Sequence, residues 1–112
     1  MSKQGLQSVF IYNLARFIIW CFQNGYELTL GEGYVSSGTG HMKNSLHYER
    51  LAQDLNFFKN GIYMDGKSEA DVKEFARIGA AWKSFLPDNR WGGDFKSKDF
   101  NHFSLSIGDG RA

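Results

Sequence analysis

The chain has 112 residues, enough for one small domain and too few for a second independent core. Hydrophobic residues make up 42% of it and aromatic residues 16%, a composition that excludes a disordered chain. The 13 basic and 12 acidic residues are mixed along the sequence and give a net charge of +1, so the basic field of a nucleic-acid-binding protein is missing. We therefore expect a single domain over residues 1–112 that is a monomer and binds no nucleic acid.

The first predicted element is a helix, because apolar residues recur at spacings of three and four between Leu6 and Cys21. Further apolar residues widen its apolar face, so we expect this helix to be mostly buried. The apolar stretch Val9–Phe22 is shorter than the ~20 residues that a bilayer requires, and Asn13 and Arg16 interrupt it. It also lacks the charged start and cleavage site of a secretory signal. We predict a core helix of a soluble protein and no membrane insertion.

The single cysteine, Cys21, lies within this helical stripe. One cysteine excludes an intrachain disulfide and a metal site built from cysteine pairs. A nucleophilic role is the alternative to a buried structural thiol, and the apolar surroundings favour the buried thiol.

The middle of the chain predicts short strands separated by turns. Alternation of apolar and polar residues over 26–30 indicates a strand, and the glycine-rich stretch 31–40 indicates a loop whose spacing fits no phosphate-binding motif. A second strand is predicted around 54–58, and a turn at 59–61 leads to a hairpin partner at 62–64.

A second helix and a last strand complete the prediction. Ser68 and Asp71 resemble a capping box, helical spacing continues to Leu86, and Pro87 ends the helix. The stretch 102–107 alternates polar with apolar residues, which predicts a strand whose polar side faces outward or into a cleft. Helices combined with short strands and a hairpin favour an α+β fold with an antiparallel sheet.

The stretch "NSLHYERLAQDLNFF", residues 44–58, places His47 and Asp54 seven positions apart among apolar residues. A carboxylate buried there without a partner would be costly. If the second and last strands are neighbours, His102 and Asp54 can meet on one face, and His47 can reach over from the preceding loop. Two imidazoles and one carboxylate form a ligand set that suits zinc with one coordination position left open. Each histidine alone could instead be a surface or satisfied core residue.

Asp99 stands three residues before His102 in "DFNHF". A carboxylate beside zinc-bound water can accept its proton and pass it to a leaving amine. A loop position that caps a turn is the alternative for Asp99.

Two motifs carry a resemblance to a known family. "SLHYERLAQD" (residues 45–54) resembles the Ser-x-His-x(6)-Asp motif of zinc peptidases that act on peptidoglycan. "WGGDF" (residues 91–95), followed by "DFNHFSL" (residues 99–105), is similar to the second half of the same signature. The family comprises D-alanyl-D-alanine carboxypeptidases and dipeptidases, and the L-alanyl-D-glutamate endopeptidases of bacteriophage endolysins. The similarity runs over residues 25–107.

The resemblance implies the hedgehog/DD-peptidase fold, a small antiparallel sheet flanked by helices. It also implies zinc held by His47, Asp54 and His102, with Asp99 as general base and acid. Ser45 and Trp91 are predicted to bind substrate; bracing the loop is the alternative for Ser45, and filling the core is the alternative for Trp91.

One position departs from the family pattern. Relatives commonly carry an arginine after the first strand that pairs with a substrate carboxylate, and Val35 stands at the matching position here. Without that cation the carboxylate loses its best partner, although Lys43 or Arg50 could substitute.

The function implied is hydrolysis of a peptide bond in the stem peptides of the bacterial cell wall. L-alanyl-D-glutamate endopeptidase activity is the first choice and D-alanyl-D-alanine carboxypeptidase activity the second, because Val35 offers no carboxylate recognition. A non-catalytic zinc module that binds cell wall or a protein partner is a further alternative. We expect a phage-type lysin that stays in the host cytoplasm until it is released to the cell wall.

Overall fold

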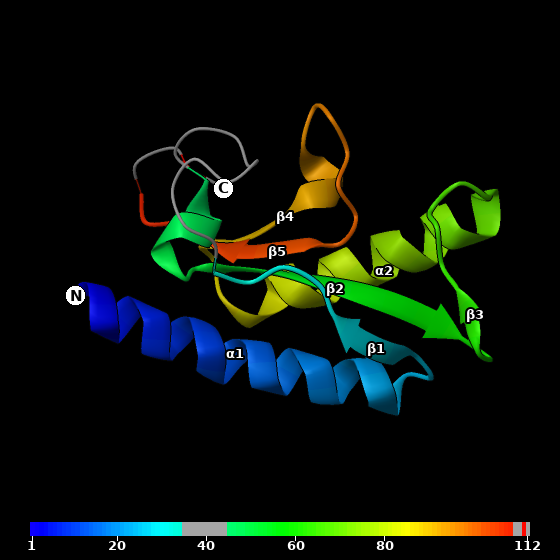
Figure 1. The fold of residues 1–112 in the computed structure, drawn as a ribbon, viewed down its shortest axis with the longest axis horizontal. Coiled ribbons are helices and arrows are strands. Elements are labelled where there is room, and N and C mark those ends of the chain that lie inside the picture. Colours follow the sequence, from blue (N-terminus) through cyan, green and yellow to red (C-terminus); the bar gives the residue numbers. More distant parts are fainter. Residues whose placement is uncertain (35–44, 109–110, 112) are drawn as a thin grey trace.

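The computed structural model describes residues 1–34, 45–108 and 111. Its helices, strands and 3-10 helices (η) follow in the order α1 (Lys3–Gln23), β1 (Glu27–Leu30), η1 (Leu46–Glu49), β2 (Ala52–Lys59), β3 (Ile62–Tyr63), α2 (Glu69–Phe85), β4 (Asn89–Trp91), η2 (Gly92–Asp94) and β5 (His102–Leu105) (Figure 1). Two helices and an antiparallel sheet of five strands confirm the predicted α+β class.

The sheet has the strand order β1-β2-β5-β4, with antiparallel pairing throughout, and β3 pairs with the end of β2. The predicted hairpin is confirmed, since Phe58 of β2 pairs with Tyr63 of β3. The condition set for the site, that the second and last strands are neighbours, is met. Asp54 lies directly opposite His102 in the β2–β5 register, so their side chains project from the same face of the sheet.

An aromatic core on the other face of the sheet fixes both helices. Phe17 of α1 lies 5.3 Å from the Trp82 ring of α2 and 5.0 Å from the Phe103 ring of β5. Phe57 of β2 lies 5.6 Å from Phe75 of α2 and 5.8 Å from Phe103, measured between ring centroids. Because these rings come from α1, α2, β2 and β5 and touch one another, both helices pack on one side of the sheet.

The first helix is confirmed, but the prediction that it is mostly buried was wrong. α1 has 21 residues and, by length and composition alone, could cross a membrane, a property that core helices and signal sequences share. Only 28% of its most apolar window is buried. One stripe packs against the core, and a second apolar stripe stays exposed because no described element covers it: Ile11, Tyr12, Ile19 and Phe22.

The polar side of β5 is more buried than expected. His102, Ser104 and Ser106 are all buried, with Ser104 0% exposed. η1 contacts β2 and η2 contacts β5, so the ends of the sheet nearest these turns are covered on both faces. The polar side chains of the last strand therefore lie in the interior of the protein rather than in water.

Candidate metal centre

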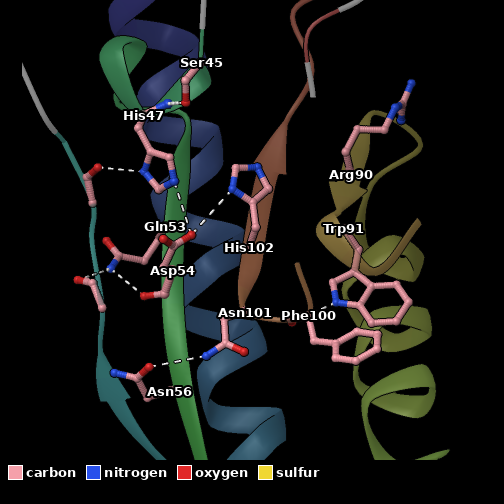
Figure 2. A network of polar contacts seen from close by, with 12 residues as sticks. Ser45, His47, Gln53, Asp54, Asn56, Arg90, Trp91, Phe100, Asn101 and His102 are labelled. Carbon is pink, nitrogen blue, oxygen red and sulfur yellow. Dashed lines mark hydrogen bonds and ion pairs between the residues drawn. The ribbon is translucent and has the colours of Figure 1, made fainter. Parts of the chain in front are cut away.

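His47 is held by a single 3-10 turn. Ser45 begins η1, and its hydroxyl accepts a hydrogen bond of 3.2 Å from the His47 N–H. The His47 side chain is 2% exposed, and its Nδ1 lies 2.7 Å from the carbonyl oxygen of Gly33. A carbonyl can only accept, so Nδ1 carries the proton in this contact, and the lone pair of the neutral ring is left on Nε2. Nε2 is the atom that points at Asp54 (Figure 2).

Asp54 is placed by β2 and by an irregularity in the strand beside it. The Gly31 N–H donates to the Asp54 carbonyl at 2.9 Å, and the Asp54 N–H donates to the Glu32 carbonyl at 2.7 Å. Gly31 and Glu32 thus both lie opposite Asp54, as in a β-bulge. A β-bulge changes the direction of the side chains beside it and is common near functional sites. A Cβ at Gly31 would lie 3.0 Å from the Asp54 Cβ, so glycine permits this close approach.

His102 is placed by β5 and by the turn before it. The Gly92 carbonyl accepts hydrogen bonds from the N–H groups of Phe95 at 3.1 Å and Asp99 at 2.8 Å. The Asp99 carbonyl in turn accepts from the His102 N–H at 3.2 Å. A Cβ at Gly92 would lie 2.0 Å from the Asp99 carbonyl oxygen, so a larger residue cannot occupy the position without moving this turn.

The three side chains converge on one point. His47 Nε2 lies 3.2 Å and His102 Nδ1 lies 3.5 Å from Asp54 Oδ1, and one ligand atom from each residue lies within 4.8 Å of the others (Figure 2). Tetrahedral zinc with bonds of about 2.0–2.2 Å holds its ligand atoms about 3.3–3.6 Å apart. The two contacts to Asp54 therefore have the spacing of ligands around one ion.

The polar atoms of this cluster are not satisfied by one another. Although both imidazole nitrogens lie within ion-pair distance of Asp54 Oδ1, that buried oxygen receives no hydrogen bond, and neither does the buried His102 Nε2, within the part of the chain described. An unpartnered buried carboxylate oxygen is costly. A cation bound between the three side chains would satisfy Asp54, so the residues present fit a metal ion.

The electrostatics of the metal-free cluster follow from burial and proximity. Burial favours the neutral acid at Asp54, but the close imidazoles of His102 and His47 outweigh it and hold the pKa of Asp54 down at about 2. Burial alone would lower the pKa of His47, but Asp54 and the Gly33 carbonyl raise it above its ordinary value. Asp54 is therefore an anion at neutral pH, the form that binds a metal.

The other predicted site residues lie around this cluster. Asp99 is exposed, in the turn before β5, and its carboxylate is not part of the three-residue cluster. Ser45 braces the turn that carries His47. Trp91 is 6% exposed, and its Nε1–H donates to the Phe100 carbonyl at 3.0 Å, so most of the ring belongs to the core. The catalytic role of Asp99 and the substrate contacts of Ser45 and Trp91 remain predictions.

Three positions bear on recognition of a substrate carboxylate: Val35, Lys43 and Arg50. Val35 and Lys43 lie outside the described residues. Arg50 is described: it is exposed, and its guanidinium carbon lies 3.9 Å from the centre of the Tyr34 ring.

The alternative of a cysteine nucleophile finds no support. Cys21 is 0% exposed, and burial raises the pKa of its thiol to about 12. The thiol is therefore protonated at neutral pH and lacks the thiolate form that attacks a carbonyl.

Two contributors to the site were missed by sequence reasoning. The carbonyl of Gly33 orients His47, and the bulge at Gly31 and Glu32 opposes Asp54. All of these act through backbone groups, which leave no side-chain signal. The only hint was the density of glycine in this stretch, which we interpreted as a loop.

A small α+β domain in which a 3-10 turn and the sheet bring two buried histidines and a partly buried aspartate together defines a candidate mononuclear metal centre. A family model described as D-alanyl-D-alanine carboxypeptidase matches residues 39–105, more than half of the chain and all three residues of the cluster. The chain belongs to this family of zinc-dependent peptidases. A comparison with curated proteins returned no match.

Proposed function

We propose that the protein is a zinc-dependent peptidase that hydrolyses a peptide bond in the stem peptides of bacterial peptidoglycan. The observation that carries this proposal is the convergence of His47, Asp54 and His102, with a buried Asp54 oxygen that receives no hydrogen bond among the described residues. Membership of a zinc peptidase family supports the reaction class. His47, Asp54 and His102 would hold the zinc ion.

The chemistry divides between the metal and the protein. When bound, zinc supplies Lewis acidity and makes a water molecule acidic near neutral pH. The Gly33 carbonyl keeps the His47 proton on Nδ1, so Nε2 stays available as a ligand. Asp99 takes the proton of the attacking water and returns it to the leaving amine. Its position in the exposed turn before β5 leaves its carboxylate accessible to water and substrate.

The first choice of bond is L-alanyl-D-glutamate, as in an endopeptidase, because the family arginine is replaced by Val35. The description of the matching family model favours the second choice, release of a terminal D-alanine by a carboxypeptidase. Mass analysis of fragments released from defined peptidoglycan by the zinc-loaded protein separates the two. Fragments that end at the L-alanine support the endopeptidase, whereas free D-alanine supports the carboxypeptidase. Absence of any new fragment would contradict a peptidase.

A non-catalytic zinc module that binds cell wall or a protein partner is the alternative, because Val35 stands in place of the family arginine. Asp99→Ala distinguishes the two. In an enzyme it should leave bound zinc unchanged and lower turnover about 10²–10⁴-fold. Asp94→Ala is the matched control, because Asp94 is an exposed aspartate nearby that pairs with Lys83 at 2.7 Å. Equal activity of the two variants would contradict the role of Asp99.

The cellular setting is a separate proposal, supported only by the resemblance to phage lysins. We propose a lysin that remains in the host cytoplasm and acts on the wall, as a monomer, once the membrane is opened. Expression in a bacterial cytoplasm with and without a membrane-permeabilising protein tests it. Lysis that requires the second protein is expected, and lysis without it would contradict the proposal.

A further inference from the structure

A row of polar side chains continues from the metal cluster along the same face of the sheet (Figure 2). Asn56 follows Asp54 by two residues on β2, and alternate residues of a strand project from the same face. Asn101 directly precedes His102, the first residue of β5. Thr29 of β1 lies opposite Asn56 in the β1–β2 register. We call Thr29, Asn56 and Asn101 the polar row.

Hydrogen bonds link the members of the polar row to one another. Asn101 Nδ2 donates to Asn56 Oδ1 at 3.3 Å, and Asn56 Nδ2 donates to Thr29 Oγ1 at 3.3 Å. Both ends of the Asn56 amide are therefore engaged within the row. The main chain at Asn101 is fixed as well, since its carbonyl accepts from the Leu55 N–H at 2.9 Å. The side chain of Asn101 is thus held in one orientation beside the metal ligand His102.

The amide of Asn101 keeps hydrogen-bonding capacity for a ligand. A side-chain amide has one oxygen that accepts and two N–H groups that donate. Asn101 uses one N–H for Asn56, and its Oδ1 has no hydrogen bond to the described residues. Asn101 is only partly buried, and its Oδ1 is open to solvent. Asn101 therefore offers one acceptor and one donor next to the cluster.

The spacing along the sheet matches an extended peptide. A strand rises about 3.3 Å per residue, so Asn56 lies about 7 Å along β2 from Asp54. A peptide lying along the strands advances by the same amount per residue. With one carbonyl at the metal centre, it can therefore place a group one or two residues away beside Asn101. In an extended chain the N–H and C=O of one residue point to the same side, where a side-chain amide can pair with both.

We propose that Asn101 binds the main chain of the stem peptide, one or two residues from the bond that is cleaved, and that Asn56 positions it. The inference rests on the proposed function and adds to it a mode of substrate recognition. Asn101 accepts a hydrogen bond from a main-chain N–H and donates one to a main-chain carbonyl, whereas Asn56 acts only through Asn101. Because this contact needs no terminal carboxylate, it suits cleavage inside a chain, as by an endopeptidase.

The direct test is an NMR titration of the zinc-loaded full-length protein, read at the side-chain amide signals of Asn101. The first probe is L-alanine capped as its N-acetyl N-methylamide, which is uncharged and has two peptide N–H groups. The second probe is the same compound with both nitrogens methylated, which keeps the carbonyls and lacks the N–H donors. We expect only the first probe to shift the signals. Equal shifts with both probes, or no shift with the first, would overturn the proposal.

Asn101→Ala should weaken binding of the capped alanine about tenfold, the effect of losing one or two neutral hydrogen bonds, read at the backbone amides of β5. Asn24→Ala is the matched control, since Asn24 is another partly buried asparagine, whose Nδ2 donates to the Trp20 carbonyl at 2.8 Å at the end of α1. Equal weakening in both variants would contradict a specific contact. The NMR spectrum and zinc content of each variant identify any that is unfolded or has lost metal.

The positioning role of Asn56 has its own test. Asn56→Ala should weaken binding of the capped alanine about threefold, because Asn101 keeps its amide but loses the partner that holds it. Asn56→Asp should restore binding, since a carboxylate accepts from both the Asn101 N–H and the Thr29 hydroxyl. No loss in Asn56→Ala, or an equal loss in Asn56→Asp with unchanged zinc content, would contradict this role.

Kinetics on wall fragments separate this inference from the proposed function. Asn101→Ala should raise KM about tenfold and leave kcat nearly unchanged, because Asn101 binds substrate away from the reacting bond. An unchanged KM would contradict the inference. If the protein hydrolyses no wall fragment, the proposed function fails, while the titration still reports whether Asn101 binds a peptide main chain.

Discussion

The two faces of β2 and β5 differ, although they belong to the same strands. On one face Leu55, Phe57 and Phe103 are at most 1% exposed and pack against rings from both helices. On the other face Asp54 and His102 are also largely buried, but polar atoms of both remain without hydrogen-bond partners within the described chain. The first face is held by apolar packing, whereas the second leaves a buried Asp54 oxygen that a bound cation would satisfy. In this fold the apolar face of the sheet thus provides stability, and the polar face carries the candidate metal site.

The largest effect on stability is expected from the apolar face. Phe57→Ala removes a ring that contacts Phe75 and Phe103, and should lower the free energy of unfolding by about 3–5 kcal/mol. Denaturant unfolding of the metal-free protein measures it. Phe58→Ala, one residue along on the opposite face and only half-buried, is the control and should cost clearly less. Equal losses would contradict the division between the faces.

A substitution in the turn beside the polar face should affect both stability and metal binding. Gly92→Ala places a Cβ against the Asp99 carbonyl and the His102 Cβ, and should cost about 1–3 kcal/mol and weaken zinc binding. Calorimetry with zinc and denaturant unfolding measure the two effects. Gly61→Ala, at a φ of +75° with open space around it, should cost about 1 kcal/mol and leave zinc binding unchanged. Unaltered zinc affinity in Gly92→Ala would contradict the role of this turn.

The stability of the metal-free protein should depend on pH through the charge pair of Asp54 and His47 on the polar face. The lowered pKa of Asp54 contributes stability that is present above its unfolded value and is lost as pH falls towards about 2. The raised pKa of His47 contributes stability that is complete below its unfolded value and is lost as pH rises through its folded value. Stability should therefore decline on both sides of a mildly acidic window, and Asp54→Asn should flatten this profile. An identical profile in Asp54→Asn would contradict the pairing.

Bound zinc should raise the stability of the protein at the alkaline pH values where the metal-free protein loses stability. Because a ligand histidine must be neutral, zinc affinity should fall as pH drops through the raised pKa of His47. The zinc-loaded protein should thus gain stability over the pH range in which the metal-free protein loses it. Thermal unfolding with and without zinc across this range measures the difference.

The smallest effect is expected from Ser45→Ala. Loss of the hydrogen bond from the His47 N–H to the Ser45 hydroxyl should cost about 0.5–2 kcal/mol and lower zinc affinity only slightly. Ser8→Ala, on the exposed side of α1, is the control. A large loss of turnover with unchanged zinc binding would instead support direct contact between Ser45 and substrate.

The apolar face could be predicted from the sequence, because alternation in β2 and β5 and the spacing of three and four in both helices mark which residues share a side. The Ser68 cap was confirmed as well, with its hydroxyl accepting from the Asp71 N–H at 3.0 Å. The short strand β4 was missed, since three residues are too few to show a period. Burial of one side of α1 only, and of Ser104 on β5, depends on which elements lie opposite, and spacing carries no such information.

The candidate site was predicted by residue type and motif, and the structure brings His47, Asp54 and His102 together. What the sequence could not show is how they are aimed. Gly31 and Gly33 act through backbone contacts. Such contributions become visible only when distant segments are seen side by side.

The central claim is that the polar face of the sheet is completed by one metal ion. Zinc content per chain, measured after dialysis by elemental analysis, tests it most directly. We predict one zinc ion per chain in the unaltered protein, and none in Asp54→Ala or His102→Ala. Stoichiometric zinc in His102→Ala, or no zinc in the unaltered protein, would contradict the account.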